Sequence, residues 1–166
     1  MKSLGLVVTV WAAVAACGGR SEADVAAYKE TVQQTLAAVA AHRERSQAAT
    51  TPDACLAEHH RYDAEVRPRV LRMQELSTGM DDCMRSRGRA DWADMGGMCS
   101  SMTGELDQYQ TSACALSDTA LDRGETARHC DVMEGYGRRA SDRANNAGNC
   151  GGVVGGPGMM GGAGMM

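Results

Sequence analysis

Residues 92–113 read WADMGGMCSSMTGELDQYQTSA and carry the clearest heptad pattern of the chain. The larger apolar side chains recur at spacings of three and four residues: Trp92, Met95, Cys99, Met102, Leu106, Tyr109 and Ala113. Such spacing puts these side chains on one face of an amphipathic helix. The stretch therefore predicts a helix that buries this face against other helices.

Three further segments have the same periodicity, and each predicts a helix. The first spans residues 21–46, with inward positions at Val25, Tyr28, Val32, Leu36 and Val39. The second runs from residue 52 to about residue 86, with Leu56, His59, Val66, Val70, Met73, Met80 and either Cys83 or Met84 inward. The last helix spans about residues 118–145, with Leu121, His129, Val132, Met133, Tyr136 and Ala140 inward.

The residues between these segments mark the helix ends. Thr51 is a predicted N-cap, and Pro52 suits the first position of a helix because its missing N–H is not needed there. We expect Pro68 to kink or split the second helix, and we expect a turn at Gly88. No period-2 alternation of β-branched residues occurs. Four helices with short connections predict an all-α, up-down-up-down four-helix bundle over residues 21–148.

The N-terminus predicts export. Lys2 precedes an apolar run from Leu4 to Ala16, which is shorter than the ~20 residues of a membrane span but suits the core of a signal peptide. The run ends in Val14-Ala15-Ala16-Cys17, which resembles the lipobox of bacterial lipoproteins. The alternative is an ordinary secretory leader followed by a chance cysteine.

The lipoprotein resemblance covers residues 1–20 and implies anchoring without implying an activity. It implies a leader that is removed (residues 1–16), lipidation of Cys17, and a short linker (residues 17–20). In this class an aspartate after the cysteine favours retention at the inner membrane. Gly18 stands there instead, so we expect a protein held at the outer membrane and facing the periplasm.

Cysteine usage predicts disulfides. Six cysteines remain after Cys17, and in an exported chain they indicate three bridges. The bundle topology suggests the pairs Cys55–Cys114, Cys99–Cys130 and Cys83–Cys150, with Cys83–Cys99 and Cys130–Cys150 as the main alternative for the last two. Only fifteen leucines and valines follow residue 16, so cross-links would reinforce a thin core. A thiolate metal store inside the bundle is the competing interpretation.

Methionines gather around the predicted turn at Gly88, and they predict a soft-metal site. Thioethers are soft, uncharged ligands that suit Cu(I) and Ag(I). The spacing Met95-x-x-Met98-x-x-x-Met102 resembles the methionine motifs of periplasmic copper-handling proteins. The candidate ligands are Met80, Met84, Met95, Met98, Met102 and, in a Gly/Met-rich tail over residues 149–166, Met159, Met160, Met165 and Met166. The alternative is that the methionines of the hairpin fill the core and the tail is a flexible linker.

Histidines form a second, weaker set of candidate ligands. We expect His59, His60 or the pair His129 and Met133 to contribute to a metal site, with Glu58 or Asp63 behind an imidazole. A dedicated site needs three or four converging ligands, and a lone inward histidine is more often a hydrogen-bonded core residue.

The sequence favours a non-enzymatic protein. It contains no GxSxG motif, no P-loop and no Gly-rich turn after a strand, and we predict no catalytic residue. Its net charge is −4 with acids and bases interleaved, so nucleic acid is not an expected partner. We expect an envelope lipoprotein whose partner is the membrane and which binds Cu(I) or Ag(I). The alternative is a structural or protein-interaction lipoprotein without a cofactor.

Overall fold

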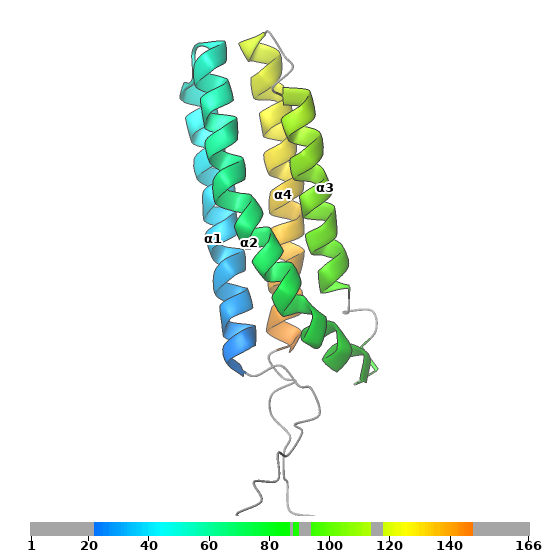
Figure 1. Ribbon diagram of the computed structural model, residues 1–166. Coiled ribbons are helices and arrows are strands. Elements are labelled where there is room, and N and C mark those ends of the chain that lie inside the picture. The colour runs from blue at the N-terminus through cyan, green and yellow to red at the C-terminus, as the bar shows by residue number, and fades with distance from the viewer. Residues whose placement is uncertain (1–21, 87, 90–93, 114–117, 148–166) are drawn as a thin grey trace, which may run out of the picture.

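The computed structural model describes residues 22–86, 88–89, 94–113 and 118–147 (Figure 1). Within these ranges the chain forms four α-helices and no strand: α1 (Glu22–Ala48), α2 (Pro52–Ser86), α3 (Met95–Ala113) and α4 (Thr119–Ala147). The predicted all-α fold is confirmed, and each observed helix lies within a few residues of its predicted limits. The predicted leader, Cys17, Trp92 and the Gly/Met tail lie outside the described residues.

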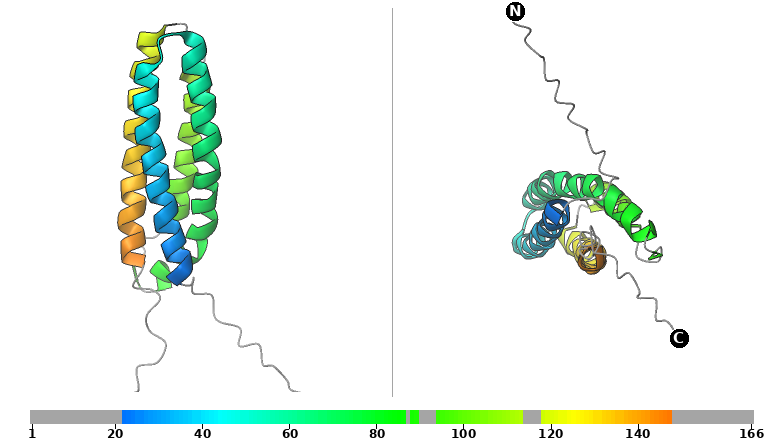
Figure 2. Two further views of the ribbon diagram at one scale, coloured as in Figure 1. Left: turned by 90° about the vertical axis from the view of Figure 1, so that its left-hand side faces the viewer. Right: turned by 90° about the horizontal axis from the view of Figure 1, so that it is seen from below.

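The helices form an antiparallel bundle in which each packs against its neighbours in the chain and α4 packs against α1 (Figures 1 and 2). We call the end with the α1–α2 turn the Thr51 end, and the end with the α2–α3 connection the Gly88 end. The first residue of α1 and the last residue of α4 both lie at the Gly88 end (Figure 1). A membrane-spanning helix is absent from the described part of the chain, where no long helix has a sufficiently apolar stretch.

The two predicted helix boundaries at the ends of α2 are confirmed. At its start, the Thr51 hydroxyl accepts a hydrogen bond from the backbone N–H of Ala54 at 3.2 Å, as an N-cap does. At its end, Gly88 has a φ of 70°, its N–H bonds to the carbonyl of Arg85 at 3.0 Å, and Arg89 N–H bonds to the carbonyl of Met84 at 2.9 Å. This pair of bonds is the Schellman motif, which requires a left-handed residue that glycine adopts without strain.

α3 is capped by a side chain of α2. The buried carboxylate of Asp81 accepts the backbone N–H of Met95 at 2.8 Å and that of Gly96 at 3.1 Å. These N–H groups have no partner within their own helix, and the positive end of the helix dipole favours a carboxylate. Asp81 therefore ties the start of α3 to α2.

Pro68 lies inside α2, which continues as a single helix from Pro52 to Ser86. The part of α2 nearer the Gly88 end leans away from the part nearer the Thr51 end (Figure 1). A proline in a helix removes one N–H donor and pushes its ring against the preceding turn, which bends the helix. The sequence predicted either a kink or a split of this helix at Pro68, and the structure has a kink.

The core has two chemically distinct halves. Toward the Thr51 end, five fully buried rings carry polar atoms: His42, His59, Tyr62, Tyr109 and His129. Toward the Gly88 end, the buried side chains are rich in sulfur: Met73, Met80, Met84, Met95, Met98, Cys99 and Met102. Cys130 and Met133 are buried near the middle.

The prediction that two leucines face the core is wrong. Leu56 is 39% exposed and Leu121 is 62% exposed. The buried face of α4 instead contains Asp122, Thr126, His129, Met133, Ala140, Ala144 and Ala147. These positions keep helical spacing, but the two nearest the Thr51 end are polar, so the apolar Leu121 misled the prediction.

The predicted Cys99–Cys130 disulfide is contradicted, because both residues carry free thiols. Glu105 contacts His129 across the α3–α4 interface, which puts Cys130 about five residues, or roughly 7 Å along the helix axis, from the level of Cys99. The prediction had assumed that the two cysteines lie opposite each other. Cys130 Sγ instead donates to the carbonyl of Val39 on α1 at 3.8 Å.

The remaining cysteines add no bridge to the described residues. Cys55 carries a free thiol, and its predicted partner Cys114 lies outside the described residues. Cys150 and the side chain of Cys83 lie outside them too. The alternative pairing used the thiols of Cys99 and Cys130, and both are free.

Candidate functional site

The polar half of the core is a cluster of two hydrogen-bonded units that stack on each other, with contributions from all four helices. Its rings are almost completely enclosed: His42 and His129 have no exposed surface, Tyr62 and Tyr109 are 1% exposed, and His59 is 2% exposed. Burying polar rings is unfavourable unless each polar atom finds a partner. The hydrogen-bond partners of these polar atoms therefore determine the protonation and the chemistry of the cluster.

The first unit of the cluster runs from Tyr109 through His42 to Glu58. His42 Nε2 lies 3.0 Å from the Tyr109 hydroxyl, and His42 Nδ1 lies 3.0 Å from Glu58 Oε1. Arg45 Nε donates to the same carboxylate oxygen at 2.8 Å. Tyrosine, imidazole, carboxylate and guanidinium thus follow one another from the core to the surface.

The second unit repeats this order with residues from other helices. His129 Nε2 lies 3.1 Å from the Tyr62 hydroxyl, and His129 Nδ1 lies 3.0 Å from Glu105 Oε1. Arg128 Nη2 donates to that oxygen at 2.8 Å. In both units the carboxylate precedes a tyrosine of the other unit by four residues on the same helix, Glu58 with Tyr62 and Glu105 with Tyr109.

Ring stacking joins the two units. His42 stacks on Tyr62 with centroids 4.0 Å apart and planes at 16°. Tyr109 stacks on His129 with centroids 4.0 Å apart and planes at 9°. Each imidazole therefore bonds to the tyrosine of its own unit and stacks on the tyrosine of the other, so the two units are locked together.

Burial decides the protonation of the two stacked imidazoles. Desolvation lowers the pKa of His42 to about 4, although Glu58 opposes the shift. Desolvation likewise lowers the pKa of His129 to about 4 against the effect of Glu105. Both are neutral at pH 7 and hold their single proton on Nδ1, toward the carboxylate. Each Nε2 is then an acceptor, and Tyr109 and Tyr62 donate their hydroxyl protons to it.

Tyr109 has a further partner that fixes one more proton. Its hydroxyl oxygen lies 2.8 Å from His59 Nδ1 and 2.7 Å from Thr126 Oγ1. Because Tyr109 donates its one proton to His42, His59 must donate to Tyr109. The other nitrogen of His59 lies 2.9 and 3.1 Å from the two oxygens of Asp122. The buried imidazole of His59 therefore lies between the Tyr109 hydroxyl and the Asp122 carboxylate.

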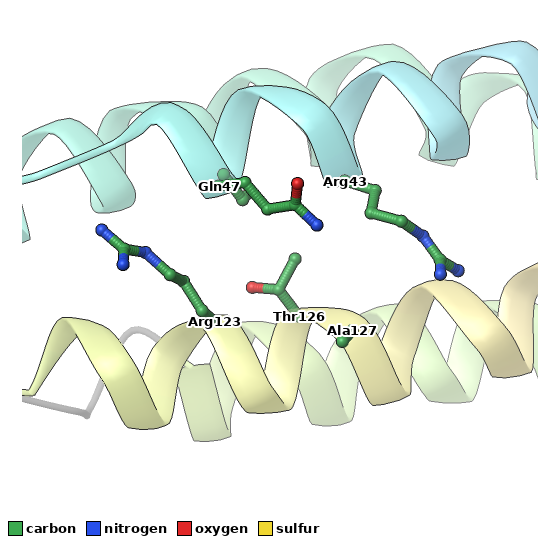
Figure 3. A pocket seen from close by; sticks show the side chains of 6 residues that line it. Arg43, Gln47, Arg123, Thr126 and Ala127 are labelled. Carbon is green, nitrogen blue, oxygen red and sulfur yellow. The ribbon is translucent and has the colours of Figure 1, made fainter.

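Solvent approaches this cluster from a small pocket between α1 and α4 (Figure 3). Its volume is about 10 Å³, which is room for about one water molecule. Figure 3 shows the guanidinium groups of Arg43 and Arg123 directed away from each other, with Gln47 and Thr126 between them. This pocket is too small to hold an organic substrate.

The predicted histidine ligands do not converge. His59 bonds to Tyr109 and Asp122, His129 bonds to Tyr62 and Glu105, and His60 is exposed. Met133 is buried in the core. Across the described ranges, no group of three or more histidine, cysteine, aspartate or glutamate side chains could hold a metal ion. Glu58 and Asp63 were predicted to accept a hydrogen bond from a metal-bound imidazole. In the structure Glu58 bonds to His42, and Asp63 bonds to Arg67.

The predicted thioether ligands of the hairpin do lie together, in the sulfur-rich half of the bundle. All five are at most 5% exposed: Met80, Met84, Met95, Met98 and Met102. Met98 belongs to the core although it stands outside the predicted heptad, and Met84 is buried at one of the two positions predicted as inward near the end of the second helix. The tail candidates Met159, Met160, Met165 and Met166 lie outside the described residues.

One free thiol, Cys99, belongs to this part of the core, and a second, Cys130, is buried near the middle of the bundle. Burial raises the pKa of Cys99 to about 12 and that of Cys130 to about 11. Both are therefore neutral thiols at pH 7. The sulfur atoms of this half therefore carry no formal charge at pH 7, and the buried carboxylate of Asp81 lies at the same end, where it caps α3.

Comparison with known proteins found no relative of this chain. No protein-family model, no curated protein and no solved structure matches the chain.

Proposed function

We propose that this protein is a lipid-anchored envelope protein that binds a soft monovalent ion, Cu(I) or Ag(I), in the sulfur-rich half of its bundle. The proposal rests on the concentration of buried thioethers toward the Gly88 end, together with the free thiol of Cys99. An ordinary core of this size would use leucine, isoleucine and phenylalanine, which have better-defined rotamers. Here the chain has no Phe and twelve Met.

The ligand chemistry favours a soft ion over a harder one. Thioether and thiolate sulfur select Cu(I), whereas imidazole and carboxylate groups suit Zn²⁺ and other divalent ions. In this bundle the imidazoles and carboxylates already satisfy one another in the other half of the core. Binding one monovalent ion with loss of one proton from Cys99 would leave the net charge of the core unchanged, which limits the desolvation cost.

The predicted anchor suits a site at this end. α1 begins at Glu22, and the five residues from Cys17 to that point reach at most ~17 Å when extended. A lipidated Cys17 would thus hold the Gly88 end, with its sulfur-rich core, close to the membrane. We expect labelled fatty acid to be incorporated into the full chain and lost in a Cys17→Ser variant; unchanged labelling would exclude the anchor.

The metal proposal is tested by anaerobic competition for Cu(I) between a colorimetric chelator and the mature chain. We expect binding much tighter than that of free methionine peptides, and at least tenfold weaker binding in a Met80→Leu, Met84→Leu, Met98→Leu variant. Leucine conserves volume, so the fold should persist, which circular dichroism checks. Deletion of residues 151–166 measures what the tail adds.

Tyr62→Phe is the matched control, because Tyr62 belongs to the other half of the core. Its affinity for Cu(I) should equal that of the unaltered chain. If the unaltered chain binds no more tightly than free methionine peptides, the methionines only fill the core. The protein would then be a structural or interaction lipoprotein without a cofactor.

A further inference from the structure

The Tyr–His–Glu units contain the groups that proton-coupled oxidation of a phenol requires. Each hydroxyl donates to a neutral imidazole nitrogen, at 3.0 Å from Tyr109 to His42 and at 3.1 Å from Tyr62 to His129. Each imidazole is held by a carboxylate on its other nitrogen. No part of the metal-binding proposal uses these groups.

A tyrosine that loses an electron becomes a strong acid, so its oxidation is easy only where a base takes the proton at the same moment. A base is effective when it lies within hydrogen-bond distance. The imidazolium that results is stabilised by the carboxylate behind it, as charge-assisted hydrogen bonds are strong in a buried site. Both conditions are met for Tyr109 and for Tyr62.

We propose that Tyr109 and Tyr62 form a pair of redox-active tyrosines, each oxidised by a high-potential one-electron oxidant with transfer of its phenolic proton to His42 or His129. The electron passes to the oxidant, which is reduced by one unit. The O–H bond of the tyrosine breaks, and an N–H bond forms at Nε2 of the imidazole. The products are a neutral tyrosyl radical and an imidazolium–carboxylate pair. Reduction of the radical returns the proton.

The buried position of the two tyrosines protects such a radical, and their proximity lets the unpaired electron move from one to the other. The two phenol rings are 1% exposed, so other radicals and large reductants cannot touch them. Their centroids are 6.3 Å apart, close enough for the unpaired electron to move between them. After Tyr109 loses its proton, its oxygen still accepts hydrogen bonds from His59 and from protonated His42.

The other two tyrosines of the bundle lack this arrangement and are internal controls. Tyr28 is fully buried, but among the described residues no base accepts a hydrogen bond from its hydroxyl. Burial raises the pKa of Tyr28, and its neighbour Cys99 is a protonated thiol rather than a base. Tyr136 is partly buried, with the guanidinium of Arg139 over its ring at 4.7 Å, and a nearby cation makes oxidation harder.

The test uses photogenerated Ru(III) tris-diimine as the oxidant and the mature chain with Trp92→Phe, Tyr28→Phe and Tyr136→Phe. We expect a tyrosyl radical, seen by transient absorption and electron paramagnetic resonance, with a yield close to that of the unaltered chain. A second variant, with Trp92→Phe, Tyr62→Phe and Tyr109→Phe, keeps Tyr28 and Tyr136, and its yield of tyrosyl radical should be at least tenfold lower. Formation of the radical should slow in deuterated water and in a His42→Gln, His129→Gln variant.

An unchanged radical yield in the variant with Tyr62→Phe and Tyr109→Phe would overturn the proposal. So would an unchanged rate of radical formation in the His42→Gln, His129→Gln variant. One measurement needs no change inside the cluster, should those variants fail to fold. The g-tensor of the radical in the unaltered chain separates a hydrogen-bonded phenoxyl from an unbonded one. We expect the hydrogen-bonded form; the unbonded form would place the radical on Tyr28 and exclude the cluster.

Discussion

The Tyr109 hydroxyl is the most connected atom of the buried cluster, with His42, His59 and Thr126 around it. The Tyr62 hydroxyl has one partner in the same cluster, His129. A buried polar atom that loses its partner costs about 1–3 kcal/mol. The two tyrosines therefore differ in how many groups their removal leaves unpaired.

We expect Tyr109→Phe to lower the free energy of unfolding by about 2–4 kcal/mol, and Tyr62→Phe by about 1–2 kcal/mol. Both changes remove one oxygen from an equally buried ring, so each is the control for the other. Chemical denaturation monitored by circular dichroism measures the difference. A Tyr62→Phe variant as unstable as Tyr109→Phe would show that the number of partners does not decide the cost.

The sequence contains the residues of the cluster but does not reveal their pairing. The four-residue spacing of Glu58 and Tyr62, repeated in Glu105 and Tyr109, is a signal in the sequence, but ordinary core packing accounts for inward tyrosines equally well. Glu58 was expected behind a metal-bound imidazole of its own helix, whereas it bonds to His42 of α1. Such pairings depend on the rotation of each helix against its neighbours, which one sequence does not specify.

At the scale of the element, helical periodicity predicted the four helices and their order. It failed where polar residues face inward: Asp122 and Thr126 take the buried positions of α4, while Leu121 points outward. A pattern rule assigns apolar residues to the core and cannot foresee a hydrogen-bonded interior. The axial register of α3 against α4 separates Cys99 from Cys130.

Asp81 is the side chain by which α2 fixes the start of α3. We expect Asp81→Ala to lower the free energy of unfolding by about 1–2 kcal/mol, because two backbone N–H groups of α3 lose their acceptor. The neighbouring Asp82 has a side chain that is 69% exposed, and Asp82→Ala should change stability by less than about 0.5 kcal/mol. Equal effects in thermal or chemical denaturation would contradict the capping role.

At the scale of the whole molecule, the neutral buried imidazoles make the bundle sensitive to acid. The pKa of His42 is about 4 in the folded chain, and so is that of His129, against about 6.5 for unfolded histidine. The unfolded chain therefore binds more protons between these values. Stability from burying the neutral rings is complete above pH 6.5 and is lost as the pH falls toward 4.

We expect the free energy of unfolding to fall by roughly 3 kcal/mol for each of the two histidines between pH 6.5 and 4. The groups that face them are Glu58, Arg45 and His59 around His42, and Glu105 and Arg128 around His129. A His129→Gln variant should have a flatter pH profile, and His60→Gln, at an exposed position, should keep the original one. A profile that is flat over this range in the unaltered chain would refute buried neutral imidazoles.

The bundle as a whole separates two chemistries along its axis, with hydrogen-bonded rings at the Thr51 end and sulfur at the Gly88 end. Both chain ends of the bundle lie at the Gly88 end (Figure 1). If Cys17 is lipidated, the sulfur-rich half faces the membrane and the ring cluster faces away from it. We propose that sulfur atoms of this half bind Cu(I) or Ag(I).

X-ray absorption at the copper edge, recorded on the mature chain loaded anaerobically with one equivalent of Cu(I), tests this claim most directly. We predict an edge typical of Cu(I) and a first coordination shell composed of sulfur alone, retained when residues 151–166 are removed. A first shell of nitrogen or oxygen, or copper that washes away before the spectrum is recorded, would contradict it.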